Sequence, residues 1–99
     1  MLKELFDLTG KTALITGGSK GIGKACARGL AEAGANIAIS ARHEDELKKA
    51  AAEIGDGLKV RVEYFVSDMN DRDEVKQLAD GVLAKFGRVD VLFNNAGSN

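Results

Sequence analysis

The chain has 99 residues, 44% of them hydrophobic and 29% charged, which suits one small globular domain. Its net charge of −1 argues against nucleic acid or an anionic membrane surface as a partner, and no apolar stretch reaches the roughly 20 residues that span a bilayer. One cysteine and one histidine exclude an internal disulfide and a histidine-based metal cluster. Residues 1–9 carry no signal-peptide pattern, so we expect a cytoplasmic protein.

The first half of the chain alternates between strand and helix patterns. We expect a strand at Lys11–Thr16, a helix that begins at Gly21 and stops near Gly34, and a second strand at Asn36–Ser40. The residues expected on the buried face of this helix are Ile22, Ala25, Cys26, Gly29, Leu30 and Ala33. In that position Cys26 would be a small packing residue rather than a nucleophile.

The second half continues the alternation with a helix at His43–Ile54, an edge strand at Val60–Val66, a helix at Asp71–Phe86 and a wholly apolar strand at Val89–Asn94. The acidic first turn of the His43–Ile54 helix, which includes Glu46, is expected to face solvent. The residues expected to be buried on the two helices are Leu47, Ala50, Ala51 and Ile54, and Val75, Leu78, Ala79, Val82 and Phe86.

Four strands alternating with three helices predict an α/β fold with a doubly wound parallel sheet in the order 3-2-1-4, formed by residues 1–99 as one domain. The loops after the first and fourth strands would then meet at the switch point, where such sheets bind ligands.

The loop after the first strand is rich in glycine, which lets backbone N–H groups approach a phosphate closely. Gly18 to Lys24 fits the first seven positions of a nucleoside-triphosphate P-loop, and Asp68 could then serve as its magnesium partner. However, Ala25 stands where a P-loop needs the hydroxyl of Ser or Thr. A glycine-rich turn without any ligand is the third alternative.

The other spacing, Gly17-x-x-x-Gly21-x-Gly23, resembles the short-chain dehydrogenase/reductase family. The resemblance rests on Thr16–Gly23, on Asp68 after the third strand and on Asn94–Gly97 after the fourth, and it extends along nearly all of the chain. The stretch "FDLTGKTALITGG" is similar to the ketoacyl-reductase and sugar-acid dehydrogenase branch. The resemblance implies a Rossmann-type unit that corresponds to the cofactor-binding half of such an enzyme.

In that family the glycine loop holds the ribose and pyrophosphate of a dinucleotide, which here implies Gly17, Ser19, Gly21, Ile22 and Gly23. The resemblance further implies that Asp68 accepts a hydrogen bond from the adenine amino group and that the Met69 backbone touches the ring. An alternative role for Asp68 is to cap the following helix. Asn94 would tie the fourth strand to its neighbours. The residues implied along the wall of the cofactor site are Asn95, Ala96 and Gly97.

The end of the second strand distinguishes the two nicotinamide dinucleotides. A site for NAD(H) has an acidic residue there, whereas this chain has Ser40, Ala41 and Arg42. Arg42 could pair with a 2′-phosphate, and Lys20 would add a second positive charge. We therefore expect NADP(H) in preference to NAD(H), the alternative being that both cations are solvated surface charges.

The parent reaction would be reversible hydride transfer between NADP(H) and a carbonyl or alcohol substrate that the sequence does not identify. The family's catalytic Ser and Tyr-x-x-x-Lys are not matched, because Tyr64 is followed four residues later by Asp68. We expect this chain alone to bind a dinucleotide without catalysis. The alternatives are a nucleoside-triphosphate binder and a non-binding structural fragment. The fourth strand would leave its edge open to self-association.

Overall fold

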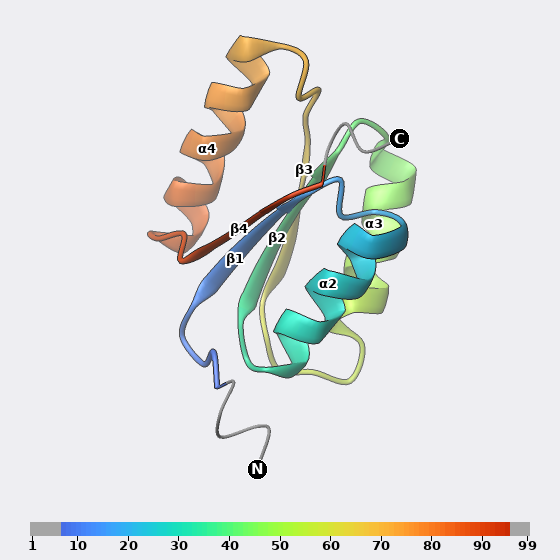
Figure 1. The fold of residues 1–99 in the computed structure, drawn as a ribbon, viewed down its shortest axis with the longest axis vertical. Helices are drawn as coiled ribbons and strands as arrows, with labels where there is room; N and C mark the ends of the chain where they lie inside the picture. Colours follow the sequence, from blue (N-terminus) through green and yellow to red (C-terminus); the bar gives the residue numbers. More distant parts are fainter. Residues whose placement is uncertain (1–6, 96–99) are drawn as a thin grey trace.

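A computed structural model describes residues 7–95 and contains one parallel sheet with helices on both faces (Figure 1). The elements, in chain order, are β1 (Thr12–Thr16), α2 (Gly21–Glu32), β2 (Asn36–Ala41), α3 (Glu44–Gly55), β3 (Val62–Val66), α4 (Arg72–Phe86) and β4 (Val91–Asn94). The strand order is β3-β2-β1-β4, and every neighbouring pair is parallel. The doubly wound, Rossmann-type fold predicted from the sequence is therefore confirmed.

The strand register brings the loops of one sheet edge together. Thr16, the last residue of β1, is level with Ser40 on one side and with Asn94 on the other. The partner of Ala41 at the end of β2 is Val66, the last residue of β3. All four strands thus deliver their carboxyl ends to the same edge, which is where ligands bind in open α/β sheets.

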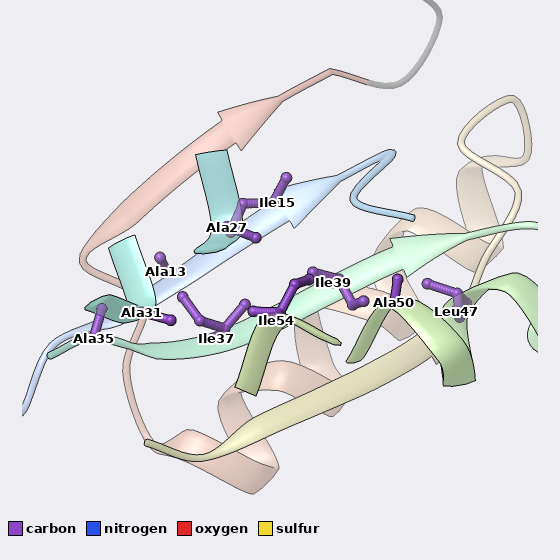
Figure 2. Packing of buried hydrophobic residues seen from close by; sticks show 10 residues of the cluster. All are labelled: Ala13, Ile15, Ala27, Ala31, Ala35, Ile37, Ile39, Leu47, Ala50 and Ile54. Carbon is purple, nitrogen blue, oxygen red and sulfur yellow. The ribbon is translucent and has the colours of Figure 1, made fainter. Parts of the chain in front are cut away.

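The larger core lies between the sheet and the two helices α2 and α3. Figure 2 shows its buried members, which are Ala13, Ile15, Ala27, Ala31, Ala35, Ile37, Ile39, Leu47, Ala50 and Ile54. A smaller cluster beneath α4 consists of Leu14, Ala38, Leu78 and Val82. The unequal clusters follow from the layering, because α2 and α3 cover one face of the sheet and α4 covers the other (Figure 1).

The face that helix α2 buries differs from the predicted one. Gly23, Ala27 and Ala31 are buried, whereas Ile22 is 72% exposed and Cys26 is half-buried. The reason is a close backbone approach, since a Cβ atom on Gly23 would lie 2.4 Å from the carbonyl oxygen of Gly17. Only glycine fits there, so the side of α2 that carries Gly23 must face the sheet, and the residues four and eight positions later follow it.

One further burial prediction is wrong on the α4 side of the sheet. Ala79 is exposed, and the turn of α4 that contacts the sheet is centred on Leu78 and Val82. The strand β4 alternates between half-buried and exposed residues, with Leu92 63% exposed. Within residues 7–95, β4 has β1 as its one strand neighbour and Leu92 is largely exposed, so the bare edge predicted from the sequence is present.

A side chain of helix α2 binds the C-terminal carbonyl groups of helix α3. The Arg28 guanidinium donates hydrogen bonds to the carbonyl oxygens of Ile54, at 3.0 Å, and Asp56, at 2.8 Å, while its Nε donates to Glu32. The last carbonyls of a helix have no intrahelical donor, and they carry partial negative charge. Arg28 therefore caps α3 and fixes the spacing of the two helices at the end far from the site.

The start of β4 is joined to β1 by a carboxylate. Asp90 accepts a hydrogen bond from the Thr12 N–H at 2.9 Å and an ion-paired one from Arg88 at 2.7 Å. These two donors, Arg88 first, hold the pKa of Asp90 below its ordinary value. The resulting stabilisation is present at neutral pH and is lost in acid, as the pH falls through that lowered pKa and the carboxylate becomes protonated.

We predict that Gly23→Ala lowers the free energy of unfolding by about 1–3 kcal/mol, because the new methyl group would meet backbone that cannot move aside. Gly29→Ala, in the same helix, meets nothing within 4 Å and should raise that free energy by up to about 1 kcal/mol. Urea denaturation followed by circular dichroism compares the two variants. Equal stabilities would contradict the steric argument.

We also predict that Arg28→Ala lowers the free energy of unfolding by about 1–2 kcal/mol, since the carbonyls at the end of α3 lose charge-assisted donors. Arg72→Ala is the matched control, because Arg72 is an exposed arginine for which the described chain records no hydrogen bond or ion pair. Thermal melting of both variants is the measurement. A melting temperature of Arg28→Ala that equals the control's would exclude the capping role.

Candidate functional site

A cleft of about 790 Å³ opens at the sheet edge where the carboxyl ends of the strands meet. It is walled by the loops that follow all four strands and by the first turns of α2 and α3. The residues that line it are Gly17, Ser19, Lys20, Gly21, Ile22, Ser40, Ala41, Arg42, His43, Glu46, Ser67, Asp68, Met69, Asn70, Asn94 and Asn95.

The glycine loop is held against the end of β2 by its own backbone. The N–H groups of Gly17 and Gly18 donate to the Ser40 carbonyl oxygen at 2.8 and 3.3 Å. Gly17 has a φ of +70°, which favours glycine, and a Cβ on Gly18 would lie 2.6 Å from the side chain of Ile39. The glycines thus let the loop turn sharply while it stays pressed against the core.

The loop delivers the N-terminus of α2 to the cleft without a polar cap. The N-cap residue, Lys20, makes no side-chain capping bond, and the first turn contains no acidic residue. Of the three helices within residues 7–95, the other two carry acidic side chains in this turn, and α4 is also capped by Asp71. An uncapped helix start presents free N–H groups and partial positive charge, which suits a phosphate.

The end of β4 is tied to β1 through one hydroxyl group. Thr16 Oγ1 donates to Asn94 Oδ1 at 2.7 Å and accepts from the Asn95 N–H at 3.1 Å. The Asn95 side chain in turn lies 3.5 Å from the Gly17 carbonyl oxygen. The predicted role of Asn94 in tying strands together is therefore confirmed, and these bonds fix Asn95 beside the glycine loop.

The loop after β3 is shaped by carboxylates. Asp68 Oδ1 accepts from the Asn70 N–H at 2.9 Å, and the Asp68 N–H donates to Glu74 at 3.1 Å. Asp71, and not Asp68, is the N-cap of α4, accepting from the N–H groups of Asp73 and Glu74. The capping alternative for Asp68 is thus wrong, and its carboxylate is placed on the cleft wall instead.

One buried polar atom in the wall lacks a partner. Ser40 is fully buried, yet within residues 7–95 its Oγ atom makes no hydrogen bond. A buried hydroxyl without a partner is costly by about 1–3 kcal/mol. Ser40 contributes to the cleft wall, but its Oγ is buried away from the open space of the cleft.

Two cationic side chains lie at the β2 side of the cleft, and one of them is already in an ion pair. Lys20 Nζ forms an ion pair with Glu46 at 3.2 Å, whereas Arg42 is exposed and makes no ion pair within the described chain. Glu46 was expected to face solvent, and its side chain is 40% exposed, but it also lines the cleft beside Lys20. The third position of α3 faces back toward the start of α2, so the carboxylate lies on the cleft wall.

The structure gathers most of the predicted binding residues on this one cleft: Gly17, Ser19, Lys20, Gly21, Ile22, Ser40, Arg42, Asp68, Met69 and Asn95. Gly23 lies behind the wall, packed against Gly17 and Asn95. Ala96 and Gly97 lie outside the described residues. The lining residues that sequence reasoning did not assign to ligand contact are Ala41, His43, Glu46, Ser67, Asn70 and Asn94. All but Glu46 lie at or shortly after a strand end, which was their signal, whereas Glu46 lies within α3 and had none.

Two residues considered for other chemistry lie off the cleft. Ala25 is exposed on α2 and does not line it, and Tyr64 packs with the larger core while its hydroxyl donates to Glu44 at 3.0 Å. That carboxylate raises the pKa of Tyr64 above its ordinary value. Residues 7–95 contain no group of three metal-ligating side chains, and none of the helices there is long and apolar enough to cross a membrane.

Comparison with known proteins points to one family. The sequence profile described as "short chain dehydrogenase" matches residues 11–99. The 3-oxoacyl-(acyl-carrier-protein) reductase of Thermotoga maritima is 43% identical over 93 residues, covering 91% of this chain and 36% of the relative. The chain spans little more than a third of that relative.

Solved structures agree with the sequence match. The L-sorbose reductase of Gluconobacter frateurii, complexed with NADPH and L-sorbose, is 40% identical with a TM-score of 0.88, covering 93% of this chain and 35% of that one. An NAD+-bound xylitol dehydrogenase is 38% identical with a TM-score of 0.87, covering 91% and 34%. The fold, the placement of the glycine loop and these matches show that the chain belongs to the short-chain dehydrogenase/reductase family, of which it corresponds to the N-terminal part.

Proposed function

We propose that this chain is the NADP(H)-binding unit of an oxidoreductase that transfers hydride between the nicotinamide and a carbonyl or alcohol substrate. The observation that carries the proposal is the convergence, on one cleft, of the uncapped start of α2, the glycine loop before it and the loop that contains Asn95. Family membership makes a nicotinamide dinucleotide the ligand that this combination fits.

The bound dinucleotide would donate or accept the hydride, and the residues of this chain would bind and orient the dinucleotide. The N–H groups at the start of α2 would hold the pyrophosphate, with the hydroxyl of Ser19 beside them. The Asp68 carboxylate would accept a hydrogen bond from the adenine amino group, with Met69 against the ring. Asn95, Ala96 and Gly97 would form the wall along the rest of the molecule.

The preference for NADP(H) rests on charge at the end of β2. No acidic residue stands at Ser40, Ala41 or Arg42, so nothing there would bind a 2′-hydroxyl or repel a 2′-phosphate. Arg42 lines the cleft and forms no ion pair with any of residues 7–95, and Lys20 lines the same cleft. A guanidinium binds a phosphate through two parallel N–H···O bonds. We therefore assign the larger part of the preference for NADP(H) to Arg42.

Catalysis would need more than the described chain offers. Reduction of a carbonyl requires a positioned proton donor. Tyr64, the one tyrosine of the chain, is half-buried against the larger core, and its hydroxyl donates to Glu44 instead of lining the cleft. We propose that this chain binds the dinucleotide and that a proton donor and the substrate contacts would come from outside residues 1–99.

We predict that Arg42→Asp abolishes or reverses a preference for NADP+ over NAD+, lowering the ratio of their affinities by about tenfold or more, because an attractive charge becomes repulsive. Isothermal titration calorimetry gives both dissociation constants. A separate titration with ATP and magnesium, the ligand that a P-loop would bind, tests the alternative function. Arg72→Asp, which makes the same charge change away from the cleft, is the control. Unchanged constants for Arg42→Asp would show that Arg42 is a solvated surface charge.

We predict further that the 99-residue chain does not oxidise NADPH above the buffer rate with ketones or ketoacids, since each missing catalytic role lowers a rate by orders of magnitude. Absorbance of NADPH measures the reaction, and Tyr64→Phe tests the one available phenol. Turnover that the wild-type chain shows and Tyr64→Phe loses would overturn this assignment of catalysis to residues outside the chain.

A further inference from the structure

Ion pairs run along the groove between α2 and α3. Lys20, at the start of α2, pairs with Glu46 of α3, and Lys24, one turn later, pairs with Glu53. Lys24 and Glu53 belong to the interhelical groove alone, whereas Lys20 and Glu46 also line the cleft. The first of the two pairs is therefore shared between the packing of the helices and the ligand site.

The Lys20–Glu46 pair is the more solvent-accessible of the two on the lysine side. The Lys20 side chain is 73% exposed and that of Glu46 is 40% exposed, at a separation of 3.2 Å. An exposed pair of this kind contributes little to stability, and its lysine is free to exchange partners. An ammonium group has three donors, so a phosphate can join or displace the carboxylate without moving the backbone.

The carboxylate of Glu46 has a different effect on each dinucleotide. A 2′-phosphate that reaches Lys20 must compete with Glu46 for the ammonium group, and it also places a second negative group close to the carboxylate. A 2′-hydroxyl carries no charge and meets neither penalty. Arg42, which has no such partner within residues 7–95, attracts the phosphate without this competition.

We propose that Glu46 is a specificity-determining residue that lowers the affinity for NADP(H) relative to NAD(H) by holding Lys20. This inference rests on the proposed function, because it requires that the 2′-position of the ribose lies between Lys20 and Arg42. Under this proposal, a carboxylate in the first turn of α3 disfavours the 2′-phosphate, because the end of β2 has no acidic residue to do so. Around the proposed 2′-position, Lys20 and Arg42 would attract a phosphate and Glu46 would compete with it for Lys20.

The test compares Glu46→Gln with Glu53→Gln, which removes the equivalent charge from the pair outside the cleft. Calorimetry at low ionic strength gives the dissociation constants of NADP+ and NAD+, and circular dichroism shows that each variant is folded. Glu46→Gln should tighten NADP+ binding by about three- to tenfold and change NAD+ binding by less than about twofold, and salt should suppress the difference. Glu53→Gln should leave the ratio of the two constants unchanged.

A double-mutant cycle with Lys20→Met tests the competition itself. Lys20→Met should weaken NADP+ binding more strongly in the Glu46→Gln background than in the wild type, because Glu46 no longer masks the lysine. Equal effects in both backgrounds, or weaker NADP+ binding by Glu46→Gln alone, would overturn the inference while leaving the proposed function intact. A wild-type chain that binds neither dinucleotide would overturn both.

Discussion

The close approach of Gly23 to the carbonyl oxygen of Gly17 is the constraint on which the rest of the structure depends. It brings the first turn of α2 against the end of β1, at a separation that a single methyl group would prevent. This contact sets the rotation of the helix, so Ala27 and Ala31 enter the core and Ile22 is left at the surface. The same contact aims the uncapped helix start into the cleft, which links core packing to ligand geometry.

The distribution of charged residues at the helix N-termini then determines which ligand the cleft favours. The N-termini of α3 and α4 are supplied with acidic side chains, whereas the start of α2 has none and remains available to an anion. The lysine before α2 does not stand alone, because Glu46 reaches it from the neighbouring helix. Packing α2 beside α3 therefore sets both the core and the electrostatic character of the cleft.

The order of elements and the ligand edge could be predicted from the sequence, because apolar periodicity changes sharply at Gly21 and the strand ends carry glycine, asparagine and aspartate. The rotation of α2 about its own axis could not be predicted, since Ile22 looks like a core residue until the contact of Gly23 with Gly17 is known. The position of Glu46 was missed for a similar reason. Its partner is 26 positions away, and only the packing of two helices brings them together.

The strand order has a consequence for when the cleft comes into existence. The bonds from Thr12 to Asp90 and from Thr16 to Asn94 each join residues 78 positions apart, so β4 docks only after nearly the whole chain has been brought round. Closing so long a loop is entropically unfavourable and slow compared with pairing β1 to β2. An early folding species with β1, β2 and α2 in place would have the phosphate-facing helix start without the Asn95 wall. A dinucleotide would consequently act as a ligand of the finished fold and draw the last step of folding to completion.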